Sequence, residues 1–167
     1  MKKLIILRHG EFDSAGQTFT PNGVNVLNDI KRQLRRHIPG DWPLHIHTSS
    51  EPAYTHTALF LADSWGENTS LGRDSRLSEK NLTDQGIDEL IQWIGMGPKR
   101  TNFASLVVTN RGLGHRLAYR YLRQHLKVSR DLVSDSQITD LKNFFAIVLD
   151  AIKKVCIIIN PNPRVLR

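Results

Sequence analysis

The stretch KLIILRHGE, residues 3–11, joins a short apolar run to a polar turn. Leucine and isoleucine fill positions 4–7, as in a buried strand. The run is shorter than the roughly 7–15 apolar residues of a signal peptide, and Arg8 and His9 end it. We therefore expect a first strand over residues 3–7, followed by a turn that carries charged and titratable side chains.

Strand and helix signals alternate beyond this turn. Thr20 and Pro21 are typical of an N-cap and of the first helical position, and apolar residues then recur at helical spacing up to Ile38. Further along, the expected elements are a strand over 44–48, a helix over 52–64, a helix capped by Thr83, a strand over 103–109, a helix from about Gly114, and a hairpin of 144–149 with 155–159.

This alternation predicts an α/β fold, a three-layer sandwich in which helices flank a mostly parallel central sheet. The 167 residues suit one domain with its own core, so residues 1–167 are interpreted as a single domain. Parallel sheets bind ligands beyond the carboxyl ends of their strands. Functional chemistry is therefore expected just after Leu7, Thr48 and Thr109.

The chain carries a formal net charge of +7, which indicates either a solvated basic surface or a preference for anionic partners such as an acidic protein. Nucleic acid is the weakest of these interpretations, because no stacking aromatic residues are interleaved with the basic ones.

No apolar run approaches the ~20 residues that span a bilayer, so no membrane association is expected. The single cysteine, Cys156, fits a reducing cytoplasm, and its apolar neighbours predict a buried, inert thiol.

Four short motifs occur in a fixed order along the first two thirds of the chain. They are Arg8-His9-Gly10 after the first strand, Phe19-Thr20-Pro21-Asn22-Gly23 at the first helix, Thr48-Ser49-Ser50 followed by Thr57-Ala58, and the apolar strand Leu106-Val107-Val108-Thr109. Together they resemble the histidine phosphatase (phosphoglycerate-mutase-like) superfamily. The length is similar to that of its compact branch, the SixA-type phosphohistidine phosphatases.

The resemblance implies a phosphoryl-transfer site. In this superfamily the first histidine attacks phosphorus, two arginines and a second histidine hold the phosphoryl oxygens, and in many members an acid protonates the leaving group. By this resemblance His9 is the catalytic nucleophile, Arg8 is a phosphate clamp, and Gly10 lets the backbone approach phosphate. The implied partner is a phosphorylated small molecule or a phosphoprotein, with no metal or cofactor.

Two positions depart from the superfamily pattern. Ala53 stands where the second arginine is expected, and Asn110 where the second histidine is expected. Asparagine can donate a hydrogen bond to phosphate but carries no charge. Losing one such donor costs about 10²–10³ in rate in a well-studied hydrolase. Arg111 could supply the missing positive charge, so Asn110 and Arg111 are both candidate phosphate ligands, although Arg111 could equally point to solvent.

Several further polar residues have two interpretations each. Glu79 is either the general acid or a surface glutamate, and Glu11 is a weaker candidate for the acid. His56 could face the pocket, whereas His115 is expected to be structural. His45 and His47 have the i, i+2 spacing of some zinc ligands, but no further ligand motif completes a metal site.

The sequence leaves two main functions open. One is a pseudophosphatase, or phosphate-binding regulatory module, that keeps the fold with an incomplete catalytic set. The alternative is a weak or specialised phosphatase that hydrolyses phosphohistidine or a phosphomonoester through phospho-His9. Sequence-independent nucleic-acid binding is a third possibility with less support. The charge of the pocket separates the first two, because a cation that replaces the missing arginine would make catalysis plausible.

Overall fold

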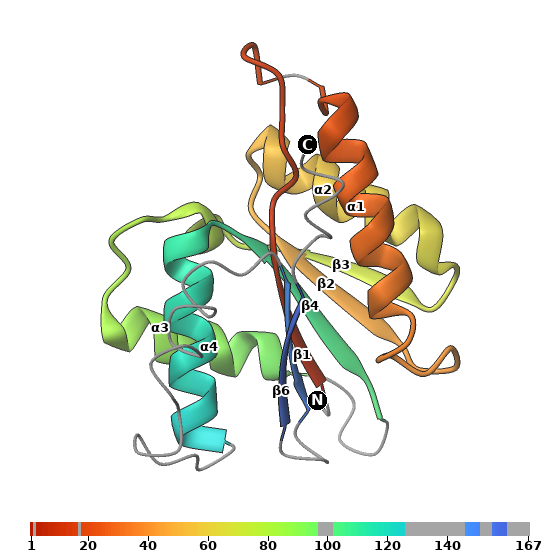
Figure 1. Ribbon diagram of the computed structural model, residues 1–167. Helices are drawn as coiled ribbons and strands as arrows, with labels where there is room; N and C mark the ends of the chain where they lie inside the picture. The colour runs from red at the N-terminus through yellow and green to blue at the C-terminus, as the bar shows by residue number, and fades with distance from the viewer. Residues whose placement is uncertain (2, 17, 97–101, 126–145, 151–154, 160–167) are drawn as a thin grey trace.

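The computed structural model describes residues 1, 3–16, 18–96, 102–125, 146–150 and 155–159. Strands and helices alternate through most of this part of the chain (Figure 1). In chain order the elements are β1 (Lys3–Arg8), α1 (Pro21–Leu34), β2 (Leu44–Thr48), α2 (Pro52–Trp65), β3 (Thr69–Arg73), the 3₁₀ helix η1 (Ser75–Ser78), α3 (Asp84–Gly95), β4 (Ala104–Thr109), α4 (Arg111–His125), β5 (Ala146–Asp150) and β6 (Val155–Ile159).

The strands form one mixed, mostly parallel sheet in the order β3-β2-β4-β1-β5-β6. The first four strands in this order run parallel to one another, whereas β5 pairs antiparallel with β1 and with β6. The predicted α/β fold class is thus confirmed, as is the hairpin near the carboxyl end. Its first strand begins at Ala146, and residues 144 and 145 lie outside the described part of the chain.

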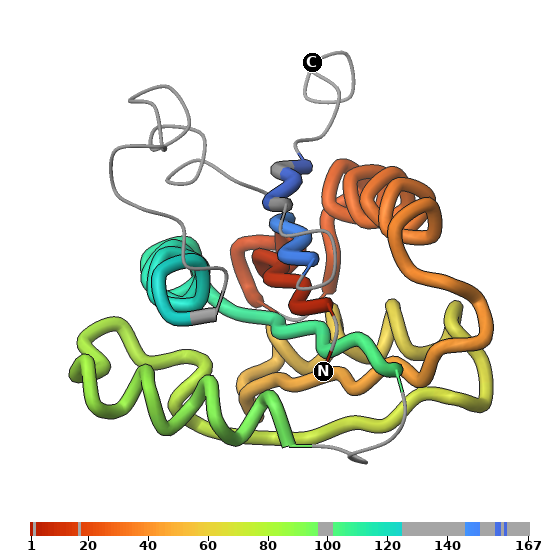
Figure 2. Tube along the Cα trace, turned by 90° about the horizontal axis from the view of Figure 1, so that it is seen from below, coloured from red at the N-terminus to blue at the C-terminus, as the bar shows by residue number. Residues whose placement is uncertain are grey.

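Two hydrophobic cores lie on opposite faces of the sheet, and the alternation of side chains along β1 divides its residues between them. Ile5 and Leu7 pack with residues of α1 and α2, whereas Leu4 and Ile6 pack with residues of α3 and α4. Figure 2, which looks from below, shows the sheet running between these two pairs of helices. The arrangement is the expected three-layer sandwich.

Local signals explain where the helices begin. The Thr20 hydroxyl accepts a hydrogen bond from the Gly23 N–H at 3.0 Å, and Thr83 caps α3 in the same way. Helix α4 begins at Arg111 and not near Gly114 as expected. Asn110 provides the cap that the prediction missed, because its Oδ1 accepts from the Leu113 N–H at 2.8 Å. Capping and the burial of Leu113 outweigh the low helix propensity of glycine at 112 and 114.

Two features differ from the sequence interpretation at the edges of the sheet. Strand β3 was not expected, because its sequence TSLGR is polar. The strand lies at an edge of the sheet and is largely exposed, so it does not need apolar side chains. Cys156 lies on the opposite edge strand, β6, and is exposed, so the prediction of a buried thiol was wrong. An edge strand has a neighbour on one side only, and apolar neighbours in sequence therefore do not ensure burial.

Among the described residues, none of the helices has the length and hydropathy of a membrane span.

Candidate functional site

The carboxyl ends of the parallel strands meet at one edge of the sheet, at the top of Figure 1. Arg8 at the end of β1 is paired in register with Thr109 at the end of β4. The His9 N–H then donates to the Thr109 carbonyl at 3.2 Å, one step beyond the last register pair. Arg8, His9, Asn110 and Arg111 are therefore brought to the same edge, as the sequence predicted.

The imidazole of His9 is held by two contacts. Its Nδ1–H donates to the Gly10 carbonyl at 3.0 Å, and its ring centroid lies 4.8 Å from that of Tyr54 at an interplanar angle of 45°. A carbonyl oxygen only accepts, so the neutral ring carries its proton on Nδ1 and its lone pair on Nε2. This is the tautomer that a nucleophile acting through Nε2 requires.

Gly10 links this turn to helix α2. Its N–H donates to the buried Thr57 hydroxyl at 2.9 Å, and that hydroxyl donates in turn to the Ala53 carbonyl at 2.7 Å. A Cβ atom at position 10 would lie 2.7 Å from the Phe19 ring and 2.9 Å from Leu27. A side chain here would therefore have to displace the Phe19 ring and the Leu27 side chain, and the role of Gly10 in approaching phosphate stays a prediction.

Arg8 and Arg111 place two positive charges near each other. Arg8 is partly buried at the end of β1, and Arg111 is exposed as the first residue of α4. Burial, and then the nearby charge of Arg111, lower the pKa of the Arg8 guanidinium. Two neighbouring cations at the positive end of a helix favour an anion between them. Arg111 is thus a second cation near Arg8, and its replacement of the arginine missing at position 53 stays a prediction.

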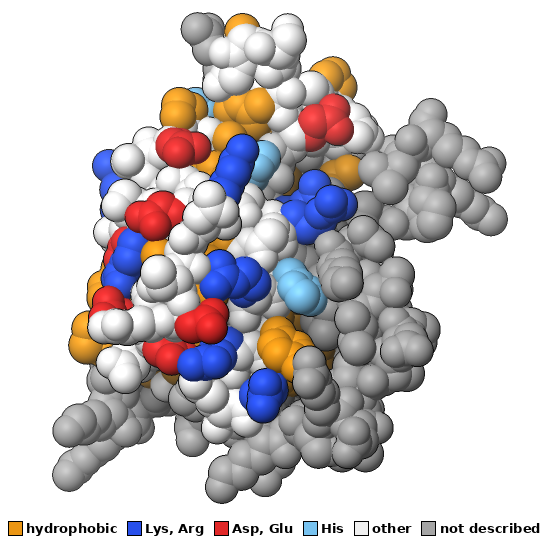
Figure 3. Space-filling view, turned by 90° about the vertical axis from the view of Figure 1, so that its left-hand side faces the viewer, with side chains coloured by type: hydrophobic (Ala, Val, Ile, Leu, Met, Phe, Trp, Pro, Cys, Tyr) orange, Lys and Arg blue, Asp and Glu red, His pale blue; other side chains and the backbone are white. Residues whose placement is uncertain are grey.

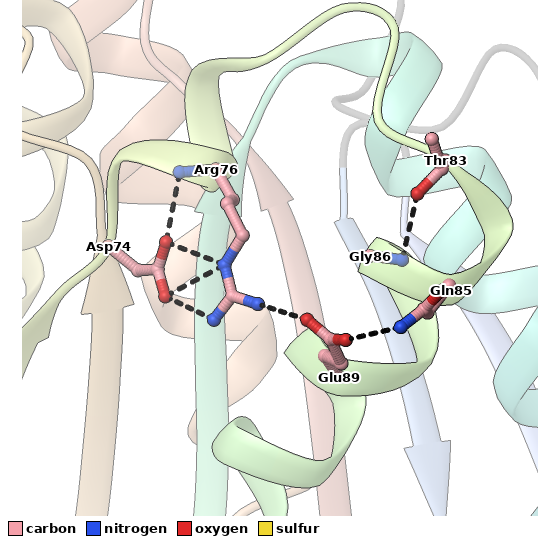
Figure 4. Close-up of polar contacts among 6 residues, drawn as sticks. All are labelled: Asp74, Arg76, Thr83, Gln85, Gly86 and Glu89. Atoms are coloured by element: carbon pink, nitrogen blue, oxygen red, sulfur yellow. Dashed lines mark hydrogen bonds and ion pairs between the residues drawn. The ribbon is translucent and has the colours of Figure 1, made fainter.

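A third arginine near this edge, Arg76, is held in a separate network (Figure 4). It donates to both carboxylate oxygens of Asp74 over 2.5–3.1 Å and lies 3.6 Å from an oxygen of Glu89. The hydrogen bond with Asp74 raises the pKa of Arg76 and lowers the pKa of Asp74. These contacts fix η1 against α3, so Arg76 serves the fold.

The side chain of Asn110 joins two segments. Besides capping α4 through Oδ1, it donates through Nδ2 to the Glu79 carbonyl at 3.4 Å. Its amide also opposes in part the rise in the pKa of the nearby Tyr54 phenol caused by burial. Asn110 therefore holds the end of η1 to the start of α4, at the edge where it was expected to contact phosphate.

The two candidate acids have different surroundings. Glu79 follows η1 and is exposed, and its main chain is fixed at the edge of the site through the hydrogen bond to Asn110. Glu11 instead accepts from the Thr20 hydroxyl at 2.8 Å and from the Asn22 amide at 3.2 Å, at the start of α1. Glu11 therefore stabilises the loop before α1, while the role of Glu79 as an acid stays a prediction.

The remaining histidines occupy other places. His56 is exposed and stacks on Phe12, with ring centroids 5.6 Å apart. His45 and His47 pack from β2 against Phe103 and Trp93, with centroid distances of 4.8 and 4.7 Å. Within the described residues, no group of three or more His, Cys, Asp or Glu side chains could hold a metal ion.

Tyr54 is the site residue that sequence reasoning missed, since it cannot supply the missing positive charge and its contact with His9 was not expected. Tyr54 and Thr57 are three residues apart on α2, so they share a face of the helix, and that face meets His9 and Gly10. The sequence signal that could have revealed this contact is the three-residue spacing between Tyr54 and Thr57, because Thr57 belongs to one of the four motifs.

The face formed by α3 and α4 carries both kinds of charge. Figure 3 shows basic and acidic side chains interleaved over it. Arg116 pairs with Asp84 at 3.1 Å and Arg120 with Asp88 at 2.6 Å. A single-sign basic surface for nucleic acid is therefore not formed by these residues.

Comparison with known proteins identifies the fold. No protein-family model matches the sequence, and no curated protein matches it. Solved structures do match. A protein of Nakamurella multipartitia assigned to the SixA phosphohistidine phosphatases aligns with a TM-score of 0.60 at 21% identity, over 89% of this chain and 83% of that one. The protein histidine phosphatase SixA in complex with tungstate aligns at 0.59 and 14%, over 99% of both chains.

A phosphoglycerate mutase from Plasmodium falciparum aligns with a TM-score of 0.58 at 15% identity, over 95% of this chain and 89% of that one. Identities this low establish the fold and leave the activity open. The chain therefore has the histidine phosphatase (phosphoglycerate-mutase-like) fold, as its four motifs predicted, and it is similar in structure to the SixA proteins.

Proposed function

We propose that the chain binds a phosphoryl group between Arg8 and Arg111 and transfers it slowly through His9, as a phosphatase. The main support is the approach of the two arginines beside a histidine whose lone pair lies on Nε2. Phosphoryl transfer depends mainly on positioning and on stabilising the charge of the equatorial oxygens. Two guanidinium groups and the amino end of α4 provide that stabilisation.

The proposed reaction has two steps. Nε2 of His9 attacks phosphorus, so that an N–P bond forms while the bond to the leaving group breaks, and the leaving group takes a proton from Glu79 or from water. Water then attacks phosphohistidine, an O–P bond forms, the N–P bond breaks and returns its electron pair to Nε2, the proton of the attacking water goes to the Glu79 carboxylate or to solvent, and inorganic phosphate leaves. Glu79 fits the first step through its place at the rim beside Asn110.

A phosphorylated protein or a small phosphate ester fits this site as substrate. Tungstate, an oxyanion with the charge and shape of phosphate, is bound by the SixA protein of similar fold. It therefore serves as a probe of the proposed anion site.

A second candidate function is a pseudophosphatase, a binding module without turnover. Two observations favour it: position 53 on α2 is an alanine, and the amide of Asn110 is engaged with Leu113 and Glu79. Under this alternative, Arg8 and Arg111 still bind phosphate, but too few groups stabilise the transition state for measurable hydrolysis.

The test compares turnover and tungstate binding in the same set of proteins. Wild type, His9→Ala and Arg111→Ala are assayed with an aryl phosphate and with a phosphohistidine peptide, and calorimetry measures tungstate affinity. Arg123→Ala is the matched control, because Arg123 is an exposed arginine on the same helix that packs over Tyr119. We expect turnover that is lost in His9→Ala, reduced in Arg111→Ala and unchanged in the control. Binding without turnover would support the pseudophosphatase, and the absence of both would contradict the proposal.

A further inference from the structure

Tyr54 occupies an unusual position for an aromatic residue in this site. It is the third residue of α2, only 7% of its surface is exposed, and its ring lies 4.8 Å from the ring of His9. Its phenol is close enough to Asn110, the cap of α4, for that amide to oppose in part the rise in the Tyr54 pKa that burial causes. One side chain therefore lies against the His9 imidazole and near the start of α4.

The imidazole of His9 needs such a contact. Its one hydrogen bond described here runs from Nδ1 to the carbonyl of the next residue, Gly10, at 3.0 Å. Rotation about χ2 of a histidine has broad minima, so one bond to a neighbouring residue restrains the ring weakly. A half-turn of the ring would direct Nε2 away from the edge that Arg8 and Arg111 define.

Two residues of helix α2 restrain His9 and its neighbour Gly10. Tyr54 packs on the ring of His9, and one turn later Thr57 accepts the Gly10 N–H at 2.9 Å. The residue whose carbonyl accepts the hydrogen bond from Nδ1–H, Gly10, is thereby also fixed relative to α2. Ring orientation and tautomer are controlled from the same helix face.

We propose that Tyr54 is a positioning residue that holds the His9 ring with its proton on Nδ1 and its lone pair on Nε2. This inference rests on the proposed function for its catalytic consequence. Tyr54 acts through His9 and need not touch the substrate.

The test measures the tautomer of His9 directly, by ¹⁵N NMR of histidine-labelled protein at a pH where the ring is neutral. Wild type is expected to show mainly the Nδ1–H form. Tyr54→Leu removes the ring contact and keeps an apolar side chain, and we expect the Nε2–H form to become the major one. Tyr54→Phe keeps the ring contact and removes only the hydroxyl, so it should shift the ratio less, in the same direction.

A matched control is Tyr119→Leu. Tyr119 also lies beside a histidine, with a ring centroid 6.5 Å from that of His115 on α4, so this change should leave the His9 signals unchanged. Thermal unfolding of each variant checks that it is folded. If Tyr54→Leu does not fold, the Phe variant alone decides. Unchanged His9 signals in every folded Tyr54 variant would overturn the proposal.

Kinetics then separate this inference from the proposed function. If wild type turns over substrate, Tyr54→Leu should lower kcat by roughly 10- to 100-fold with a much smaller change in KM, because the nucleophile is misplaced while Arg8 and Arg111 still bind phosphate. Unaltered kcat together with an unaltered tautomer would reject the role of Tyr54 and leave the phosphatase intact. An altered tautomer in a protein without any turnover would support the role of Tyr54 and reject the phosphatase.

Discussion

The His9 N–H donates to the Thr109 carbonyl over 3.2 Å, which extends the pairing of β1 with β4 past the end of both strands. Because of this bond, the residue after β1 and the residues that open α4 leave the sheet side by side. The position of His9 next to Asn110 and Arg111 is thus fixed by the backbone.

The charge of Arg111 should be needed for anion binding. Arg111→Ala should weaken tungstate binding about tenfold or more, equivalent to about 1.4 kcal/mol, because one of two neighbouring cations is lost. Arg111→Lys should retain part of the affinity, since a point charge replaces paired donors. Calorimetry at low ionic strength measures both. Equal affinity in wild type and Arg111→Ala would show that the arginine points to solvent.

Asn110 should contribute to stability through its cap. Asn110→Ala should lower the free energy of unfolding by about 1 kcal/mol, because the Leu113 N–H loses its acceptor. Asn110→Asp keeps an acceptor at the start of α4 and should be less destabilising than alanine. The added negative charge beside Arg8 and Arg111 should nevertheless abolish tungstate binding. Urea unfolding and calorimetry on the same samples check this pair of outcomes, and stability losses in the reverse order would refute the capping role.

A side chain at position 10 should destabilise the fold. Gly10→Ala brings a Cβ to within 2.7 Å of the Phe19 ring and 2.9 Å of Leu27, so unfolding should become easier by about 1–3 kcal/mol. Gly40→Ala is the control, because a Cβ there meets nothing within 4 Å and the backbone is not left-handed. Thermal denaturation compares the two, and similar melting temperatures would mean that the Phe19 loop moves aside at little cost.

His47 should make stability depend on pH. It is 7% exposed, neither ring nitrogen has a hydrogen-bond partner, and burial lowers its pKa from 6.5 to about 4. Between pH 4 and 6.5 the unfolded chain therefore binds a proton at His47 that the folded chain does not bind. The free energy of unfolding has its full value above pH 6.5 and decreases as the pH falls towards 4. At 1.36 kcal/mol per unit, the loss amounts to about 3 kcal/mol.

Urea unfolding between pH 4 and pH 7 measures this effect as the difference between wild type and His47→Leu. The variant should lose less stability in that window, whereas His56→Gln, a change at an exposed histidine, should follow wild type. Parallel curves for wild type and His47→Leu would mean that His47 becomes solvated and accepts the proton.

The parts of the fold that the sequence predicted are those with strong local signals. The apolar run of β1, the Thr20 and Thr83 caps and the helical periodicity of α1 each act within a few residues. Strand β3 lacks such a signal, because it is an edge strand with a polar sequence. The periodicity also extended α1 to Ile38, which is buried, although the helix ends at Leu34 in a turn before Pro39.

The site was predictable to the extent that it follows strand ends. Arg8, His9, Asn110 and Arg111 were all placed together from topology alone, and the structure brings them together. The contact between Tyr54 and His9 was not predictable, since it depends on how α2 packs on the turn after β1. The hydrogen bond of Asn110 to the Glu79 carbonyl likewise arises from tertiary packing, whereas its cap on the Leu113 N–H is a local contact, and both give it a structural role beside its expected one.

The most direct test of the central claim is to trap the phosphoryl group on the protein. The chain is mixed with an excess of a reactive phosphate donor, quenched at alkaline pH where phosphohistidine survives, and analysed by peptide mass spectrometry beside His9→Ala. We expect one phosphoryl group on His9, attached through Nε2, and none in the variant. Phosphorylation at another residue, or an unlabelled His9 in protein that binds tungstate, would contradict the account.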